Sequence, residues 1–218
     1  MPDPRYLKNL PESASFKGDA RAGEIEIINK TQAPKIREKT GILLEDKLHF
    51  FVRDVVKFPS GDTRTQMRII GCTMFDGPSG VVALAARDGK IFLREMFRHA
   101  TRRWELETPR GQRETGYTAE EAARKEINEE LGFRVANIEK IGEVSGDTAI
   151  LASTLPIFWA DLEPGAPHDH PEGSEAFGKI IELDPTTLKG RIVRGDIRDG
   201  YTLSAITLAQ IAGKLHLP

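Results

Sequence analysis

Apolar and polar residues alternate in several short runs of this chain, which is the period expected of half-buried β-strands. The clearest isolated run is Glu-Ile-Glu-Ile-Ile at residues 24–28. By alternation, or by richness in Val, Ile and Phe, further strands are predicted at residues 48–58, 63–73, 81–86, 91–97, 137–144, 155–162 and 177–183. The run 81–86 is apolar nearly throughout, which is typical of a central strand buried on both faces. Asp88-Gly89 is a strong hairpin signal between two of these runs.

A helical period replaces the alternation at residues 119–131. Apolar residues recur there every four positions and form a stripe that faces a core: Ala123, Ile127 and Leu131. Thr118 followed by Glu121 fits a capping box, and Gly132 can adopt the left-handed conformation that ends a helix. The spacing therefore predicts a helix over residues 119–131.

The order of these elements predicts a mixed α/β (α+β) protein. A last helix is expected to begin at Asp199 and to end near Gly213. The length of 218 residues suits a main domain at 48–218 with an extension at 1–47. The strand at 24–28 needs a partner sheet, either from this chain or from another copy of it.

Three carboxylates lie on one side of the predicted helix, because Glu126, Glu129 and Glu130 are three and four residues apart. At an effective dielectric of about 20, two carboxylates roughly 5 Å apart repel by about 3 kcal/mol. Water screening reduces this to about 0.2–0.5 kcal/mol for an exposed helical pair. Such a pattern alone is more often a solvated acidic face than a binding site. The glycine loop before the helix, Gly132 and the apolar Phe133 favour instead a site for Mg²⁺, which prefers hard oxygen ligands.

The composition narrows the class of protein. A net charge of −2 gives no reason to expect a nucleic-acid partner. The single cysteine, Cys72, allows no internal disulfide, which fits a reducing compartment. The chain has no apolar run of about 18 residues and no signal-peptide core near its first residue. We therefore expect a cytoplasmic protein that binds neither membrane nor nucleic acid.

Residues 109–133, PRGQRETGYTAEEAARKEINEELGF, resemble the Nudix box, Gly-x5-Glu-x7-Arg-Glu-U-x-Glu-Glu-x-Gly-U, where U is apolar. Seven positions match at the required spacing: Gly111, Glu126, Ile127, Glu129, Glu130, Gly132 and Phe133. Two positions depart from the box. Tyr117 stands in place of the first glutamate, and Lys125 stands in place of the arginine, whose two-pronged geometry is lost. The carboxylates that would hold a metal are intact.

The segment 104–111 is similar to the Glu-x-Pro-x-Gly segment that precedes the box in the ADP-ribose pyrophosphatase branch of this family. The resemblance implies the Nudix fold, a mixed sheet sandwiched between helices. It also implies hydrolysis of the pyrophosphate bond of a nucleoside diphosphate linked to another group, with Mg²⁺ as the metal and Mn²⁺ as the alternative. ADP-ribose or a nucleotide sugar is the first candidate, and ADP-ribose would give AMP and ribose 5-phosphate. An N-terminal strand resembles the one through which this branch exchanges strands, so we expect a homodimer.

The resemblance also assigns roles to residues. The expected metal ligands are the Gly111 carbonyl and the carboxylates of Glu126, Glu129 and Glu130. Six arginines lie within 20 residues around the loop and together suit phosphate binding: Arg94, Arg98, Arg102, Arg103, Arg110 and Arg113. Arg98 and Arg110 are taken as substrate-binding residues. Glu107 is either a third such residue near the metal or a structural hydrogen-bond acceptor.

Glu172 and Glu175 close a loop at residues 164–173. The resemblance to the pyrophosphatase branch makes both candidates for the general base, of which Glu175 is preferred. For His168 and His170 in the same loop, a solvated loop is favoured over a metal site. Two alternatives remain for the whole chain. One is a nucleotide-binding or regulatory module that kept the fold without turnover, for which Tyr117 and Lys125 argue. The other is a hydrolase of capped or free nucleoside triphosphates, which the pre-box segment disfavours.

Overall fold

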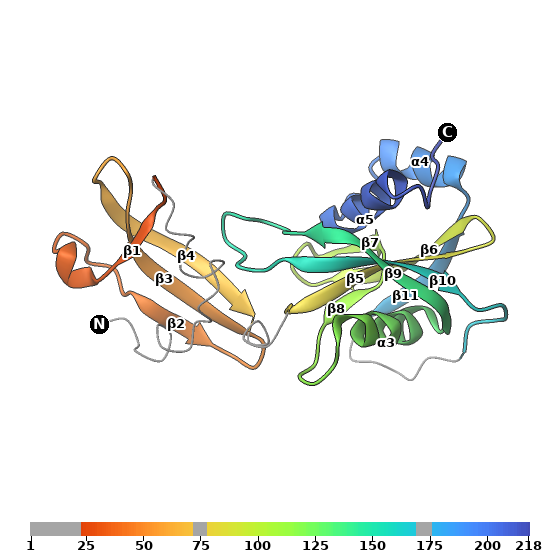
Figure 1. Cartoon of the computed structure of the whole chain (residues 1–218), viewed down its shortest axis with the longest axis horizontal. Helices are drawn as coiled ribbons and strands as arrows, with labels where there is room; N and C mark the ends of the chain where they lie inside the picture. The colour runs from red at the N-terminus through yellow and green to blue at the C-terminus, as the bar shows by residue number, and fades with distance from the viewer. Residues whose placement is uncertain (1–22, 72–77, 169–175) are drawn as a thin grey trace. The chain divides into compact units, whose positions relative to one another are not determined.

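The structure, a computed structural model, describes residues 23–71, 78–168 and 176–218, which form two compact units (Figure 1). The first unit comprises Met1–Ser79 with Asp147–Ser153, and the second comprises Gly80–Gly146 with Thr154–Pro218. The domain boundary expected at residue 47 falls inside the first unit, because the strands on either side of it pair with each other.

The first unit is a small antiparallel sheet built around β3 (His49–Lys57). Along its whole length β3 pairs with β4 (Thr63–Gly71), and its remaining pairings are with β1 (Glu26–Ile28) and β2 (Gly41–Glu45). A short 3₁₀ helix, η1 (Lys30–Gln32), follows β1. The strands expected near residues 24–28, 48–58 and 63–73 are thus confirmed, the last as far as Gly71. The first of them finds its partner within the same chain.

The core of the first unit is small. Val52 and Ile70 are fully buried, and Ala152 from the segment Asp147–Ser153 packs against them. On β3, Asp54 is also buried and accepts a hydrogen bond from Nε of Arg68 at 2.8 Å. Burial outweighs this neighbouring charge and raises the pKa of Asp54 to about 7.

The second unit is organised around a seven-stranded sheet in which β11-β6-β5-β10-β9 lie in that order. Its strands are β5 (Gly80–Arg87), β6 (Lys90–Arg98), β7 (Arg103–Glu107), β8 (Arg110–Gln112), β9 (Val135–Val144), β10 (Leu155–Leu162) and β11 (Phe177–Leu183). The strands predicted at 81–86, 91–97, 137–144, 155–162 and 177–183 are confirmed. Among the described strands of this sheet, only the pair β5–β10 is parallel, which makes the sheet mixed.

The sheet forks between β5 and β6. These strands pair only near their hairpin turn, and beyond Phe92 the strand β6 pairs with β7 while β5 pairs with β8. Thr108 and Pro109, which connect β7 to β8, bridge the fork. The Thr108 hydroxyl donates to the Ala83 carbonyl at 2.6 Å, and the Ala83 amide donates to the Pro109 carbonyl at 2.9 Å. The segment that precedes the box is thereby fixed to the central strand.

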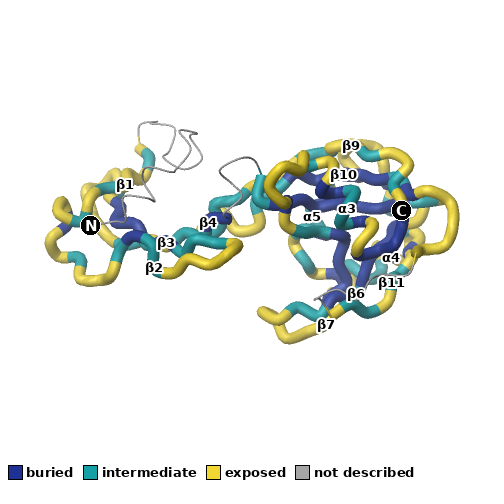
Figure 2. The backbone as a smooth tube through the Cα atoms, turned by 90° about the horizontal axis from the view of Figure 1, so that it is seen from below, coloured by how far each residue is buried: buried dark blue, intermediate teal, exposed yellow. Residues whose placement is uncertain are grey.

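Helices cover both faces of this sheet (Figure 1). One face packs against α3 (Ala119–Leu131) through a core that includes Ile127 and Phe158. The other packs against α4 (Pro185–Val193) and α5 (Gly200–Ile211) through a core that includes Leu84 and Ile206. The central strands are buried along their length (Figure 2). The expected architecture, a mixed sheet between helices, is confirmed; α4 is an additional helix.

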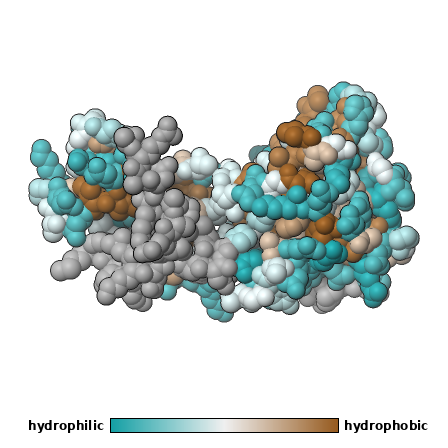
Figure 3. All heavy atoms as spheres, viewed as in Figure 1, coloured by the Kyte–Doolittle hydropathy of each residue, from teal (hydrophilic) through white to brown (hydrophobic). Residues whose placement is uncertain are grey.

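The surface of the second unit is not uniformly polar. In Figure 3, hydrophobic residues reach the surface over the region of α4 and α5. Val193 and Ile211, at the ends of these two helices, are 79% and 77% exposed. Within the described ranges, none of the helices has the length and apolar character needed to cross a membrane.

Candidate active site

The predicted helix α3 is confirmed with both of its ends fixed by local hydrogen bonds. At its start the Thr118 hydroxyl accepts from the Glu121 amide at 3.2 Å, and the Glu121 carboxylate accepts from the Thr118 amide at 2.8 Å. At its end Gly132 has a φ of 70°, in the left-handed region that favours glycine. These ends determine where the three candidate metal ligands project.

The three carboxylates of α3 have different surroundings. Glu130 is buried, with 4% of its surface exposed, whereas Glu126 is half-buried and the Glu129 side chain is 49% exposed. At the same turn of the helix, Nη1 of Arg94 donates to the Glu130 carbonyl at 2.6 Å and ties α3 to β6. The acidic side is therefore not a uniformly solvated face.

Glu126 lies directly against β8. A Cβ atom added to Gly111 would be 2.2 Å from Cδ and from Oε1 of Glu126, and 2.4 Å from its Oε2. Contacts this short cannot persist, so any larger residue at position 111 would displace the end of the Glu126 side chain. The glycine of the box thus leaves room for the glutamate of the box.

We tested the residues of this site against the divalent cation that the family resemblance implies. Within residues 23–71, 78–168 and 176–218, no three His, Cys, Asp or Glu side chains are already gathered closely enough to hold a metal. The donors that α3 and β8 offer are nevertheless all oxygen atoms, from carboxylates and a carbonyl, which Mg²⁺ and Mn²⁺ prefer. The carboxylate of Glu126 also lies directly against Gly111, the residue of β8 whose carbonyl is a candidate ligand. By donor chemistry the site fits a hard divalent cation.

The two departures from the box lie together in the structure. Nζ of Lys125 is 5.8 Å from the ring centroid of Tyr117 and 3.7 Å from Oε1 of Glu129. It also forms a close ion pair with Glu114, and this hydrogen bond raises the pKa of Lys125. Glu114 therefore provides a carboxylate for Lys125 from the same loop as Tyr117. Sequence reasoning missed Glu114, although its charge and its place in the loop before the helix were visible.

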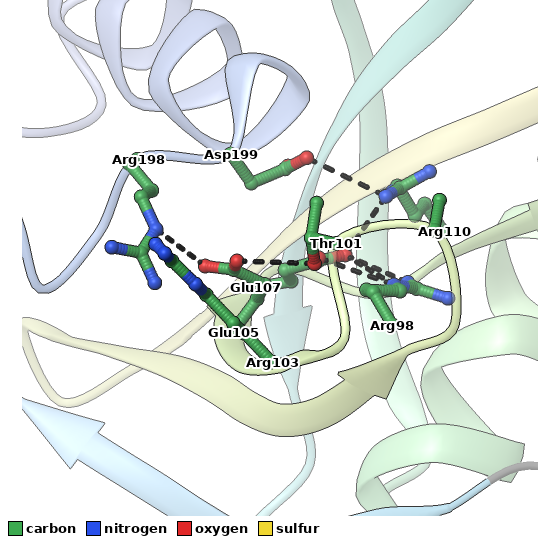
Figure 4. Close-up of a pocket in the computed structure, with 9 residues that line it drawn as sticks. Arg98, Thr101, Arg103, Glu105, Glu107, Arg110, Arg198 and Asp199 are labelled. Carbon is green, nitrogen blue, oxygen red and sulfur yellow. Dashed lines mark hydrogen bonds and ion pairs between the residues drawn. The ribbon is translucent and has the colours of Figure 1, made fainter.

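A cavity of about 540 Å³ lies beside the last residue of β6 and along β7 (Figure 4). Arg98, Glu107 and Arg110, the three residues expected to bind substrate, all line it. The other lining residues are Ala100, Thr101, Arg103, Glu105, Arg198 and Asp199. Two residues of its wall come from the loop before α5, which is anchored because the buried Thr108 amide donates to the buried Thr202 hydroxyl at 3.0 Å. This contact between distant parts of the chain positions Arg198 and Asp199 at the cavity.

Glu107 organises one group of charges in the cavity. It is 2% exposed and accepts from Nη2 of Arg98 at 2.7 Å, and Nη2 of Arg110 lies 3.0 Å away. Arg110 also lies 3.4 Å from Oδ1 of Asp199 and 5.0 Å from the ring centroid of Tyr201. In this structure Glu107 accepts from two arginines and so orients both guanidinium groups; its expected role near the metal and substrate stays a prediction.

Glu105 organises a second group. It is 8% exposed, and its carboxylate accepts from Nε of Arg198 at 2.8 Å and from the Thr101 hydroxyl at 3.4 Å. Glu105, Thr101, Arg198 and Asp199 are lining residues that sequence reasoning missed. The only available signal was Asp199, recognised there as the residue that begins the last helix.

Four of the residues discussed from the sequence lie outside the described residues: Cys72, His170, Glu172 and Glu175. The role of Glu175 as general base therefore stays a prediction. His168 is described; it is exposed, and its amide donates to the Gly132 carbonyl at 2.8 Å.

The fold and the box together define a class of hydrolase. A family model for the NUDIX domain matches residues 74–184, and the chain belongs to this family. The family resemblance and the expected enzyme class, a Nudix hydrolase, are thus confirmed. Among solved structures, the chain is similar to the crystal structure of an ADP compounds hydrolase, with a TM-score of 0.64 and 20% identity over 83% of this chain and 100% of that one. At this identity the likeness shows the fold alone. A comparison with curated proteins gave no match.

Proposed function

We propose that this chain hydrolyses, with a divalent metal ion, the pyrophosphate bond of a nucleoside diphosphate linked to another group. ADP-ribose or a related nucleotide sugar is the first substrate to test. The observation that carries the proposal lies on β8, where consecutive residues contact the arginine-rich cavity and the acidic helix. Arg110 lines the arginine-rich cavity, and Gly111 receives the carboxylate of Glu126 from the acidic helix.

Mg²⁺ is the proposed metal, with Mn²⁺ as the alternative. Glu126, Glu129, Glu130 and the Gly111 carbonyl would hold it. When bound, such an ion neutralises charge on the diphosphate and lowers the pKa of a water molecule. Two observations support this assignment: these oxygen donors fit a hard cation, and the Glu126 carboxylate lies directly against Gly111.

The arginines of the cavity would bind and orient the diphosphate. Arg98 uses Nε and Nη2 to reach Glu107, which fixes the plane of its guanidinium before any substrate arrives. Glu107 and Asp199 hold Arg110 in the same way. Preorganised donors of this kind stabilise the charge that develops on phosphoryl oxygens, because they need no reorganisation during the reaction. Glu175 remains the proposed general base for the attacking water.

One solved structure with the same fold is that of an ADP compounds hydrolase, which supports an adenosine diphosphate compound as the first choice of substrate. With ADP-ribose, water would attack one phosphorus atom and the bridging P–O bond would break, giving AMP and ribose 5-phosphate. A nucleotide-binding module without turnover is the alternative.

The test is to incubate the protein with ADP-ribose and Mg²⁺ and to measure AMP. Glu129→Gln and Glu130→Gln are expected to lower the rate at least about 10²-fold, as the removal of a preorganised electrostatic group does. Glu120→Gln is the matched control, since Glu120 is an exposed residue of the same helix that pairs only with Arg124 on the surface. Near-normal turnover in both test variants would rule out the assignment. Binding of ADP-ribose without AMP would support the non-catalytic module.

The assembly and the location of the protein also remain proposals. We propose a homodimer formed through the first unit, because several of its large apolar side chains are exposed: Ile25, Ile27, Leu44, Leu48 and Met67. Light scattering at micromolar concentration would show the mass of a dimer, and a monomer peak would refute it. The single cysteine and the net charge of −2 support a cytoplasmic protein without a nucleic-acid partner.

A further inference from the structure

The charged side chains of the cavity form two groups that differ in net charge. Around Glu107, two arginines face two carboxylates, since Arg98 and Arg110 are paired with Glu107 and Asp199. This group is neutral in sum. Around Glu105, two arginines face one carboxylate: Arg198 is paired with Glu105, and Arg103 lines the same cavity. One positive charge is left over at this end.

Arg103 and Arg198 differ from the arginines around Glu107 in how they are held. Within the part of the chain that the structure describes, the Arg103 side chain has no hydrogen-bond or ion-pair partner, and Arg103 is exposed. Arg198 is 48% exposed and is held to the buried Glu105 through Nε. In Figure 4 the guanidinium groups of both are drawn on the same side of Glu105. Terminal nitrogens of an arginine held through Nε remain available as donors, because a guanidinium carries five.

The two groups of charges are anchored at different places on β7. Their buried carboxylates belong to Glu105 and Glu107, which are two residues apart, or about 6.6 Å along a strand. A diphosphate held by Arg98 and Arg110 would therefore leave Arg103 and Arg198 to another part of the substrate.

From this arrangement we infer that Arg103 and Arg198 form a subsite for a phosphate monoester carried by the substrate in addition to its diphosphate. This inference rests on the proposed function and narrows its substrate class to phosphorylated nucleoside diphosphate compounds. Two guanidinium forks match the oxygens of a phosphate group, and the charge left over at this end attracts a dianion. A volume of about 540 Å³ lies within the range of small-molecule sites, roughly 300–1,000 Å³.

The experiment compares three substrates that differ only in this phosphate: ADP-ribose, ADP-ribose 1''-phosphate and ADP-ribose 2'-phosphate. The two phosphorylated compounds distinguish a monoester on the terminal ribose from one on the adenosine. The wild-type protein is expected to cleave one of them with a higher kcat/KM than ADP-ribose. Arg103→Gln and Arg198→Gln are each expected to lower kcat/KM for that compound about 10-fold to 100-fold, mainly through KM. In the same variants, kcat/KM for ADP-ribose should fall much less, so that the preference for the phosphorylated compound disappears.

Arg134→Gln is the matched control. Arg134 is an exposed arginine of the same unit that does not line the cavity, and its replacement should change none of the three kcat/KM values. A wild-type protein without preference for either phosphorylated compound would overturn the subsite. So would equal losses on all three substrates in the Arg103 and Arg198 variants.

A second measurement separates this inference from the proposed function. Calorimetry with ribose 5-phosphate and metal-free protein reports on binding of a phosphate monoester without turnover. The wild type is expected to bind it, and Arg198→Gln is expected to weaken binding at least about 10-fold. If no substrate is cleaved but this difference is found, the proposed function fails and the subsite stands. If ADP-ribose is cleaved but Arg103→Gln and Arg198→Gln both bind ribose 5-phosphate as tightly as the wild type, the function stands and the subsite is wrong.

Discussion

Replacement of Gly111 by alanine is the smallest change that should disturb the acidic helix without removing any of its carboxylates. The new Cβ would lie 2.2 Å from Cδ and Oε1 of Glu126. Carbon atoms in contact are normally about 3.5–4.0 Å apart, so the carboxylate must move by more than about 1 Å. The glycine is in an extended strand, and a methyl group there causes no backbone strain.

This geometry predicts a large loss of activity with a small loss of stability. A displacement of about 1 Å in a catalytic constellation costs on the order of 10²-fold in rate. The group that must give way is the end of a flexible, half-buried side chain, so we expect the free energy of unfolding to fall by about 1 kcal/mol, the low end of the cost of overpacking. Gly111→Ala should therefore fold normally and cleave ADP-ribose about 10²-fold more slowly.

The assay measures AMP release and urea unfolding side by side for the wild type, Gly111→Ala and Gly190→Ala. Gly190 makes the control because it lies inside α4, away from the cavity, and an added Cβ would meet only the end of the Arg194 side chain at 3.3 Å. Alanine there should raise stability by about 0.5–1 kcal/mol and leave the rate unchanged. Full activity of Gly111→Ala would refute the role given to the contact between Gly111 and Glu126.

Three further variants test other parts of the structure. Glu107→Gln should lower the free energy of unfolding of the second unit by about 3 kcal/mol, measured with urea, because two partly exposed arginines lose their buried partner; an unchanged value would contradict the ion-pair network. Thr118→Ala should cost about 1 kcal/mol by removing the cap of α3, and a Tm equal to that of the wild type would count against the cap. The pKa of Asp54 is raised from 3.8 to about 7, so the folded state binds more protons than the unfolded state between these values. The first unit should therefore lose stability as pH rises from about 4 to 7, and Asp54→Asn should flatten this dependence; the same slope in both proteins would exclude Asp54 as its source.

The elements of the second unit were predictable where local signals agree. The capping box at Thr118, the four-residue apolar period and Gly132 give the limits of α3 as observed. Asp88-Gly89 likewise joins β5 to β6, as its turn chemistry indicates. Helix α4 was missed, although Asp184 and Pro185 at its start are a cap and a favoured first residue. Its interior Gly190 and its short length weakened the helical pattern.

The arrangement of the site was only partly predictable, because it depends on contacts between distant parts of the chain. Arg98, Glu107 and Arg110 are close in sequence, and they do line one cavity. Arg198 joins them because Thr108 holds the start of α5 through Thr202, a contact across 94 residues that no local pattern reveals. The boundary between the two units was not predictable for a similar reason: β3 has the composition of any buried strand, and nothing local tells which sheet it joins.

The metal site can be tested most directly by anomalous diffraction from crystals of the protein soaked with Mn²⁺. We expect an anomalous peak bonded to carboxylate oxygens of Glu126, Glu129 or Glu130 beside Gly111, and we expect the peak to be lost in Glu126→Gln. Absence of any ion from these carboxylates in a protein that still cleaves ADP-ribose would contradict the role proposed for α3.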